Sequence, residues 1–232
     1  MRLGIFTDSH YSSKDVTCNV RYNSRSLCKI KEAFEYFSEQ KCDHVICLGD
    51  LIDKEDSHEK EIENLKSVSR VFSEYDMRIS VVMGNHDAFA FDVDEFFSVL
   101  GEKYIPVDLF TENTALIFID ACHFKTGEHY KRGDSDWTDT YYPHTDDLRA
   151  RLARVQGDAY VFLHQVIDPE IRADHRLYND AEIRAVLEES KKVRAVFEGH
   201  YHEGHDSRLN GIRYTTFPAM CEKDDAYYVT EI

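Results

Sequence analysis

The stretch "VRAVFEGHYHEGH", residues 193–205, joins an apolar run typical of a buried strand to three histidines within six positions. Residues i and i+2 of an extended segment project to the same side, so His200 and His202 can approach one centre as a pair. Gly199 precedes them and fits a turn that needs close backbone approach or a positive φ. A metal-binding role for this pair depends on whether similar side chains end other strands.

Four further apolar runs end in side chains of the kinds that bind metals. Open α/β sheets gather their ligand sites at the carboxyl ends of the strands, so we expect these side chains to meet at one edge. Gly49 and Gly84 stand in two of the turns and fit the same requirement for close approach or positive φ. The residues that follow the four runs are Asp8 and His10, Asp50 and Asp53, Asn85 and His86, and His164.

The chemistry of these side chains predicts the type of metal. They are carboxylates, an amide and imidazoles, without a thiolate, which suits Mn²⁺, Fe or Zn²⁺ better than a cysteine-rich structural zinc site. Seven or more ligands of these kinds are too many for one ion, and they suit two ions about 3.5–4 Å apart that share a carboxylate. We therefore expect two divalent metal ions as cofactors.

The apolar runs alternate with helical patterns, which predicts an α/β fold. The runs are continuously apolar, so we expect sheets that are covered on both faces. Helical spacing of apolar residues predicts helices over 24–39, 59–75 and 180–190. The last two strands follow each other without a helix, so we expect the second half to be partly antiparallel. Strands are expected over 3–7, 44–48, 79–83, 115–120, 159–164, 193–198, 212–217 and 226–232.

The organisation along the chain is simple. No linker rich in proline, glycine or serine divides it, so we expect a single domain over 1–232. Two stretches, 9–23 and 121–142, show neither helical nor strand periodicity. Long irregular loops are uncommon in a compact domain and are often functional, so these two are candidates for substrate contacts.

Composition limits the function. Lys and Arg number 28 against 44 Asp and Glu, which gives a formal net charge of −16. Such a surface repels a phosphate backbone, so nucleic-acid polymers are not expected as partners, whereas a small phosphorylated molecule can bind beside a local cation. No apolar run approaches the roughly 20 residues that span a bilayer.

The cellular location is predicted from the first residues and from the cysteines. Met1 is followed almost at once by a strand pattern and not by a signal peptide, so we expect a cytoplasmic protein without membrane partners. The six cysteines form no C-x-x-C pair and are expected to be reduced thiols. The acidic cluster 222–225, Glu-Lys-Asp-Asp, is expected to be solvated surface.

The strand-end motifs together resemble the signature of the calcineurin-like metallophosphoesterases. They are "DSH" at 8–10, "GDLID" at 49–53, "GNHD" at 84–87, the strand-ending His164 and "GHYH" at 199–202, and they cover nearly the whole chain. The resemblance implies a four-layer α/β/β/α sandwich with a two-metal centre at its edge.

The resemblance also implies a role for each motif residue. His86 would be the catalytic imidazole near the leaving group, and Asp53 would orient it. Asp50 would bridge the two metals. The first metal would be held by Asp8, His10, Asp50 and His202, and the second by Asp50, Asn85, His164 and His200.

Looser stretches point to one branch of this family. Residues 9–37 and 163–222 resemble the manganese-dependent ADP-ribose/CDP-alcohol diphosphatases. Val166 stands where that branch usually has a proline, which affects the loop after His164 but not the ligand set. Cyclic-nucleotide phosphodiesterases share the same metal motifs.

The function expected from these features is hydrolysis of phosphodiester or pyrophosphate bonds in small nucleotide-like substrates. Metal-activated hydroxide would attack, and His86 would protonate the leaving oxygen. The alternatives are a phosphomonoesterase or cyclic-nucleotide phosphodiesterase on the same centre, and a non-catalytic scaffold with the same fold. Substrate selectivity is expected from the two long loops, through Arg21, Tyr22 and His123, with aromatic residues such as Trp137. The sequence leaves the oligomeric state open.

Overall fold

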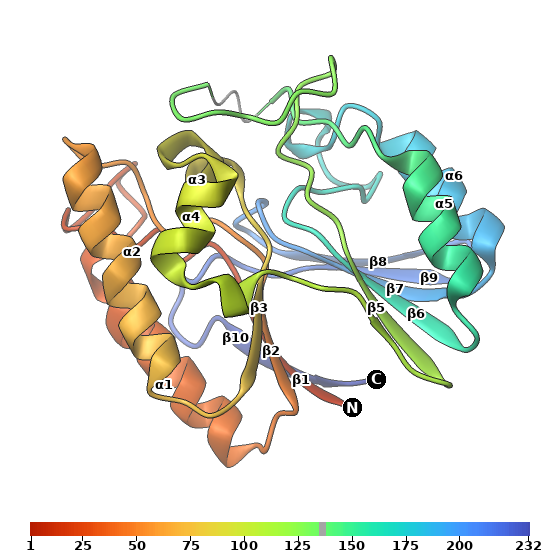
Figure 1. The fold of residues 1–232 in the computed structure, drawn as a ribbon, viewed down its shortest axis with the longest axis horizontal. Helices are drawn as coiled ribbons and strands as arrows, with labels where there is room; N and C mark the ends of the chain where they lie inside the picture. Colours follow the sequence, from red (N-terminus) through yellow and green to blue (C-terminus); the bar gives the residue numbers. More distant parts are fainter. Residues whose placement is uncertain (135–137) are drawn as a thin grey trace.

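Two β-sheets face each other in the computed structural model, and helices cover the outer face of each (Figure 1). The structure describes residues 1–134 and 138–232. The first sheet has the strand order β10-β1-β2-β3 and the second β4-β5-β6-β7-β9-β8. The strands are β1 Arg2–Phe6, β2 His44–Cys47, β3 Arg78–Val81, β4 Leu109–Phe110, β5 Thr114–Phe118, β6 Asp158–Phe162, β7 Val193–Glu198, β8 His205–Leu209, β9 Ile212–Thr216 and β10 Tyr227–Glu231.

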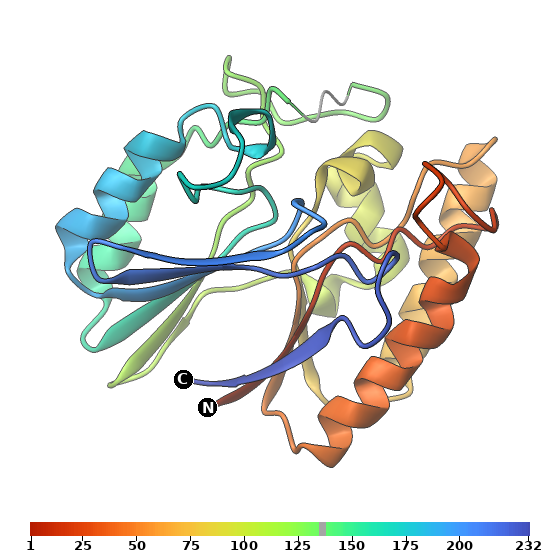
Figure 2. The ribbon, with the colours of Figure 1, turned by 180° about the vertical axis from the view of Figure 1, so that it is seen from behind.

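The helices fall into two outer layers. Helices α1 to α4 lie beside the first sheet, and α5 and α6 cover the second, as the view from behind also shows (Figure 2). This arrangement is the four-layer α/β/β/α sandwich that was expected. The helices are α1 Ser26–Glu39, α2 His58–Ser73, α3 Asn85–Ala90, α4 Val93–Leu100, α5 Thr145–Arg154 and α6 Asp180–Ser190, with 3-10 turns at Asn23–Arg25, Glu102–Tyr104 and Ala173–His175.

Each sheet is buried on both faces, which explains the continuous apolar runs. In β1, Phe6 packs into the core under α1 and α2, whereas the preceding Ile5 packs into the core between the two sheets. The same alternation places Cys47 of β2 on the helix side and Ile46 on the inter-sheet side. A strand between two apolar layers needs apolar side chains at successive positions.

The strand pairing directs one set of strand ends to one edge. β1, β2 and β3 run parallel, as do β5, β6, β7 and β9. The antiparallel pairs are β10 with β1, β4 with β5 and β8 with β9. The expectation of a partly antiparallel second half is confirmed, although the last two strands, β9 and β10, lie in different sheets.

Several elements were not predicted. β8 has the sequence HDSRL and lies at the edge of its sheet, where polar side chains can face water. In α5 only Leu148 and Leu152 are buried. Two apolar positions among many charged residues give too weak a helical pattern to predict a helix from the sequence. Among the residues that the structure describes, no helix is both long and apolar enough to cross a membrane.

Candidate metal centre

The predicted ligands gather at the carboxyl ends of β1, β2, β3, β6 and β7. Four of them, Asp8, His10, Asp50 and His200, have positive φ angles of 52°, 42°, 51° and 66°. Such backbone conformations are unfavourable for residues other than glycine and cluster at functional sites. The turns after β1, β2 and β7 therefore hold these side chains in fixed, strained positions.

The glycines beside the ligands serve the close approach that the sequence predicted. Gly49 has a φ of +103°. A Cβ atom on Gly84 would lie 2.1 Å from Oδ1 of Asp50, and one on Gly199 would lie 2.2 Å from Oγ1 of Thr7. Any side chain at these two positions would displace residues at the centre.

The first donor set surrounds Nε2 of His10. This nitrogen lies 3.6 Å from Oδ1 of Asp8, 3.5 Å from Oδ2 of Asp50 and 3.2 Å from Nε2 of His202. Nε2 of His202 lies 3.3 Å from Oδ1 of Asp8. An ion with ligands at about 2.1 Å separates neighbouring donor atoms by roughly 3.0–3.4 Å. The four distances lie in or close to this range, so these side chains are candidates to hold a single metal ion.

The second donor set shares one atom with the first. Oδ2 of Asp50 lies 3.3 Å from Nε2 of His164, which is 3.2 Å from Oδ1 of Asn85. One ring nitrogen of His200 lies within 4.8 Å of ligand atoms of Asp50 and His164. The carboxylate of Asp50 thus stands between two groups of donors, as a bridging ligand requires.

Hydrogen bonds on the far side of the ligands fix their orientation. Nδ1 of His164 donates to the carbonyl oxygen of Leu48 at 2.7 Å, so in the neutral ring Nε2 carries no proton and faces the centre. Nδ1 of His202 lies 2.5 Å from Oε1 of Glu222. Oδ2 of Asp8 accepts from the backbone N–H of His200 at 2.9 Å, which leaves Oδ1 toward the donors.

The charges of the centre are those of a cation site. Burial raises the pKa of Asp8, but hydrogen bonds to His10 and His202 outweigh it and hold that pKa well below its usual range. Burial lowers the pKa of His164 and of His202, yet the adjacent carboxylates raise both to about 9. Burial and the neighbouring His86 lower the pKa of His10 to about 4. Without an ion, protons on two histidines balance the carboxylates.

His86 stands beside the donors but is held by a different carboxylate. Its Nδ1 lies 2.9 Å from Oδ1 of Asp53, and its backbone N–H donates to Oδ1 of Asp50 at 2.8 Å. Burial lowers the pKa of His86, but Asp50 and Asp53 raise it by more. The pKa of His86 therefore lies above its ordinary value of 6.5. Oδ2 of Asp53 accepts in turn from Nδ2 of Asn23 at 3.0 Å. Asp53 thus orients the ring, and the two carboxylates favour its protonated form.

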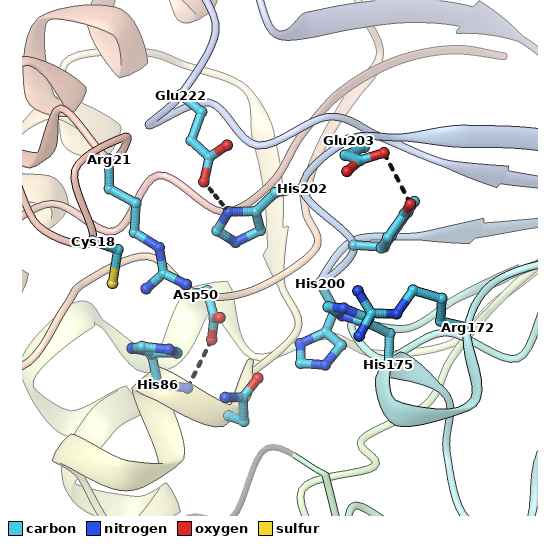
Figure 3. A pocket seen from close by; sticks show the side chains of 12 residues that line it. Cys18, Arg21, Asp50, His86, Arg172, His175, His200, His202, Glu203 and Glu222 are labelled. Carbon is cyan, nitrogen blue, oxygen red and sulfur yellow. Dashed lines mark hydrogen bonds and ion pairs between the residues drawn. The ribbon is translucent and has the colours of Figure 1, made fainter.

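A cavity of about 470 Å³ opens over the centre. Arg21 and Arg172 point into it from opposite sides (Figure 3). Tyr201 adds an aromatic ring to the lining. The residues that line it are Cys18, Arg21, Asp50, Asn85, His86, Arg172, His175, His200, Tyr201, His202, Glu203 and Glu222.

The predicted substrate residues are only partly at this cavity. Arg21 lines it, with its guanidinium 3.9 Å from Oδ2 of Asp53. Tyr22 is not among the lining residues, and its ring lies under the guanidinium of Arg25. His123 is also absent from the lining and packs against His129, with ring centroids 4.7 Å apart. Trp137 lies outside the described residues.

Sequence reasoning missed several residues of the site. Glu222 was expected to be solvated surface, but it contacts His202. Its position at the end of the stretch that resembles the diphosphatase branch was the available signal. Arg172, His175 and Tyr201 line the cavity from the loop before α6 and from the turn after β7, and no periodicity marks them.

Comparisons with known proteins show which family model and which folds this chain is similar to. The model of the calcineurin-like phosphoesterase superfamily domain matches residues 1–218. None of the curated proteins compared with the chain matches it.

Solved structures share the fold at low identity. A dimetal phosphatase from Danio rerio superimposes with a TM-score of 0.82 at 16% identity, over 95% of this chain and 88% of that one. A protein from Thermus thermophilus gives 0.65 at 11%, over 95% and 90%. The Plasmodium protein GAP50, described as the anchor in the inner membrane complex, gives 0.65 at 16%, over 93% and 70%.

Proposed function

The chain belongs to the calcineurin-like phosphoesterase superfamily, and we propose that it hydrolyses phosphodiester or pyrophosphate bonds in small nucleotide-like substrates. The observation that carries the proposal is the position of Asp50, whose Oδ2 lies 3.5 Å from a donor of one set and 3.3 Å from a donor of the other. A shared carboxylate between two donor sets is the arrangement of a two-metal hydrolase.

The two donor sets support one assignment of ligands. Asp8, His10, Asp50 and His202 would hold one divalent ion, and Asp50, Asn85, His164 and His200 would hold the other. When bound, the two ions supply positive charge for the phosphoryl oxygens and lower the pKa of coordinated water. Imidazole, carboxylate and amide donors suit Mn, Fe or Zn alike.

His86 is placed to donate a proton to the departing oxygen. Its Nδ1–H is held by Asp53, and its side chain is 28% exposed toward the cavity. In the imidazolium form the other nitrogen, Nε2, carries a proton that can be transferred as the ester bond breaks. Asp53 acts as a positioning residue, because it stabilises this charged form and sets the ring plane.

The two arginines support a substrate with more than one phosphate. Arg21 and Arg172 flank the cavity (Figure 3), and guanidinium groups bind phosphate oxygens in bidentate fashion. In a chain of net charge −16 they supply local cations for a diphosphate. The ring of Tyr201 offers a surface on which a base can stack. These contacts favour the diphosphate ester among the candidate substrates, including the ADP-ribose/CDP-alcohol class.

A non-catalytic scaffold is the second candidate, because the same fold occurs in the Plasmodium anchor protein. The complete donor sets and His86 argue against it. The test is turnover with Mn²⁺, Fe²⁺ or Zn²⁺ of nucleotide diphosphate esters, cyclic nucleotides, bis-p-nitrophenyl phosphate and p-nitrophenyl phosphate. We expect the diphosphate ester to have the highest kcat/KM. A preference for p-nitrophenyl phosphate would show a phosphomonoesterase, and no turnover with two metal equivalents bound would show a scaffold.

A further inference from the structure

A second group of histidines lies in a hairpin that follows β5. The backbone N–H of Tyr130 donates to the carbonyl of Cys122 at 2.8 Å, and that of Phe124 donates to the carbonyl of Glu128 at 2.9 Å. His123 pairs with His129 across this hairpin. The pairing brings the two imidazole rings together, with centroids 4.7 Å apart.

A carboxylate completes the group. Ligand atoms of Asp120, His123 and His129 all lie within 4.8 Å of one another. Oδ1 of Asp120 accepts from the backbone N–H of Cys122 at 2.9 Å, which turns Oδ2 toward Nε2 of His129, 3.0 Å away. The group shares no residue with the two donor sets described above.

The hydrogen bonds of His129 indicate what the site needs. Its Nδ1 lies 2.7 Å from the carbonyl oxygen of Tyr130, and a carbonyl can only accept, so Nδ1 carries the proton. In the neutral ring Nε2 is then an acceptor that faces another acceptor, Oδ2 of Asp120. Only a second proton or a metal ion makes this contact favourable.

A second proton on His129 would leave the surroundings of His123 unexplained. Its side chain is 8% exposed, and its Nδ1 is buried without a hydrogen-bond partner among the described residues. A buried polar atom without a partner is unfavourable unless something fills the position. The thiol of Cys122 does not fill this position, because its Sγ contacts the carbonyl of Met83 and the amide of Gln165.

We propose that Asp120, His123 and His129 bind a third, single divalent transition-metal ion of the Zn²⁺ type, which fixes the hairpin 122–130. Two imidazoles and one carboxylate are a usual protein ligand set for Zn²⁺, and water supplies the fourth ligand at this partly exposed site. Donation from Nδ1 of His129 to a carbonyl is the outer contact that orients a metal-binding imidazole. This proposal does not depend on the proposed hydrolase function.

The test is the number of Zn²⁺ ions that the full chain binds. After chelation and titration with ZnCl₂, we expect three equivalents in the wild type and two in His129→Gln and Asp120→Asn. His58→Gln breaks a similar histidine–carboxylate contact with Glu95 and is the matched control, with three equivalents expected. Equal Zn²⁺ content in the wild type and the two variants would overturn the proposal.

A measurement on the wild type removes the dependence on variants that fold poorly. Crystals soaked in ZnCl₂ are expected to show an anomalous difference peak between Asp120, His123 and His129. Peaks at the two-metal centre without one at this position would mean that the cluster is a charged His129–Asp120 pair, and would reject the site.

Discussion

Nδ1 of His86 and Oδ1 of Asp53 lie 2.9 Å apart, and this contact fixes the plane of an imidazole that faces the cavity. The contact lies outside both donor sets. His86, the proposed acid, is therefore held by a carboxylate that is not one of the proposed metal ligands.

His86→Asn is expected to keep both metal ions and to lower kcat by about 10²–10⁴-fold for a substrate with a poor leaving group. The loss should be smaller for bis-p-nitrophenyl phosphate, whose leaving group needs little protonation. Metal content by mass spectrometry and a leaving-group series check both parts. Asp53→Asn should move the alkaline limb of the pH–rate profile to lower pH, because loss of the carboxylate lowers the pKa of His86, which must be protonated to act as the acid, while metal content is preserved. The same loss for every leaving group, or loss of a metal, would show that His86 is a ligand and not the acid.

Asp50→Asn is expected to lose metal and activity together. Its Oδ2 is the atom shared by the two donor sets, and an amide oxygen has no charge with which to balance two cations. Metal equivalents per chain, measured after dialysis, give the result directly. Ser80→Ala, a change between the sheets and away from the centre, is the control. Two equivalents in Asp50→Asn would disprove the bridge.

Gly84→Ala is expected to disturb the carboxylate of Asp50 without removing a ligand. The added Cβ would lie 2.1 Å from Oδ1 of Asp50, so the bridge or the turn must move. We expect weaker binding of both ions and a large loss of kcat, with the fold kept by circular dichroism. Unchanged metal affinity would show that the turn relaxes without moving the carboxylate.

Arg21→Ala is expected to raise KM for a nucleotide diphosphate ester by roughly 10–100-fold, which is the loss of a charged hydrogen bond of about 1.5–3 kcal/mol. Turnover of bis-p-nitrophenyl phosphate, which has no second phosphate, should barely change. Arg25→Ala removes a neighbouring guanidinium that lies over Tyr22 and outside the cavity, and it serves as the matched control. Equal losses on both substrates would assign Arg21 to the support of Asp53.

Metal binding is expected to release protons. In the metal-free protein the pKa values of His164 and His202 are about 9, so both rings are largely protonated at pH 7. Both must lose a proton to bind a metal, so apparent affinity should rise with pH up to about pH 9. Calorimetry in buffers of different ionisation enthalpy measures the proton number, for which we expect about two at pH 7. No proton release would contradict the assignment of these rings as ligands.

His44 is expected to make the metal-free protein less stable in acid. Burial lowers the pKa of His44 to about 4 from the ordinary 6.5. The contribution of the buried neutral ring to the free energy of unfolding is therefore complete above pH 6.5 and is lost as pH falls to 4. The difference corresponds to about 3 kcal/mol. Urea unfolding in EDTA should show that His44→Leu lacks this part of the pH dependence. Ser80→Ala, which removes the 2.9 Å partner of the ring but keeps the ring, should retain it.

The sequence by itself determined that both faces of the sheets are covered and which kinds of ligand follow the strands. Strand ends, glycines and metal-type side chains are local features, and the carboxyl ends of parallel strands meet at one edge for reasons of topology alone. The runs at 44–48 and 193–198 coincide closely with β2 and β7, since a strand buried on both faces must be apolar throughout. Asp8, Asp50 and His164 therefore came to one place as expected.

Only the tertiary structure decided which side chains face one another. His10 and His202 are 192 residues apart, and their contact depends on how the two sheets pack. The same packing brings Arg172 and Tyr201 to the cavity, pairs Glu222 with His202, and leaves His123 beside Asp120 and His129 instead of in the cavity lining. Loops carry no periodic pattern, and their directions follow from long-range contacts that the sequence pattern does not contain.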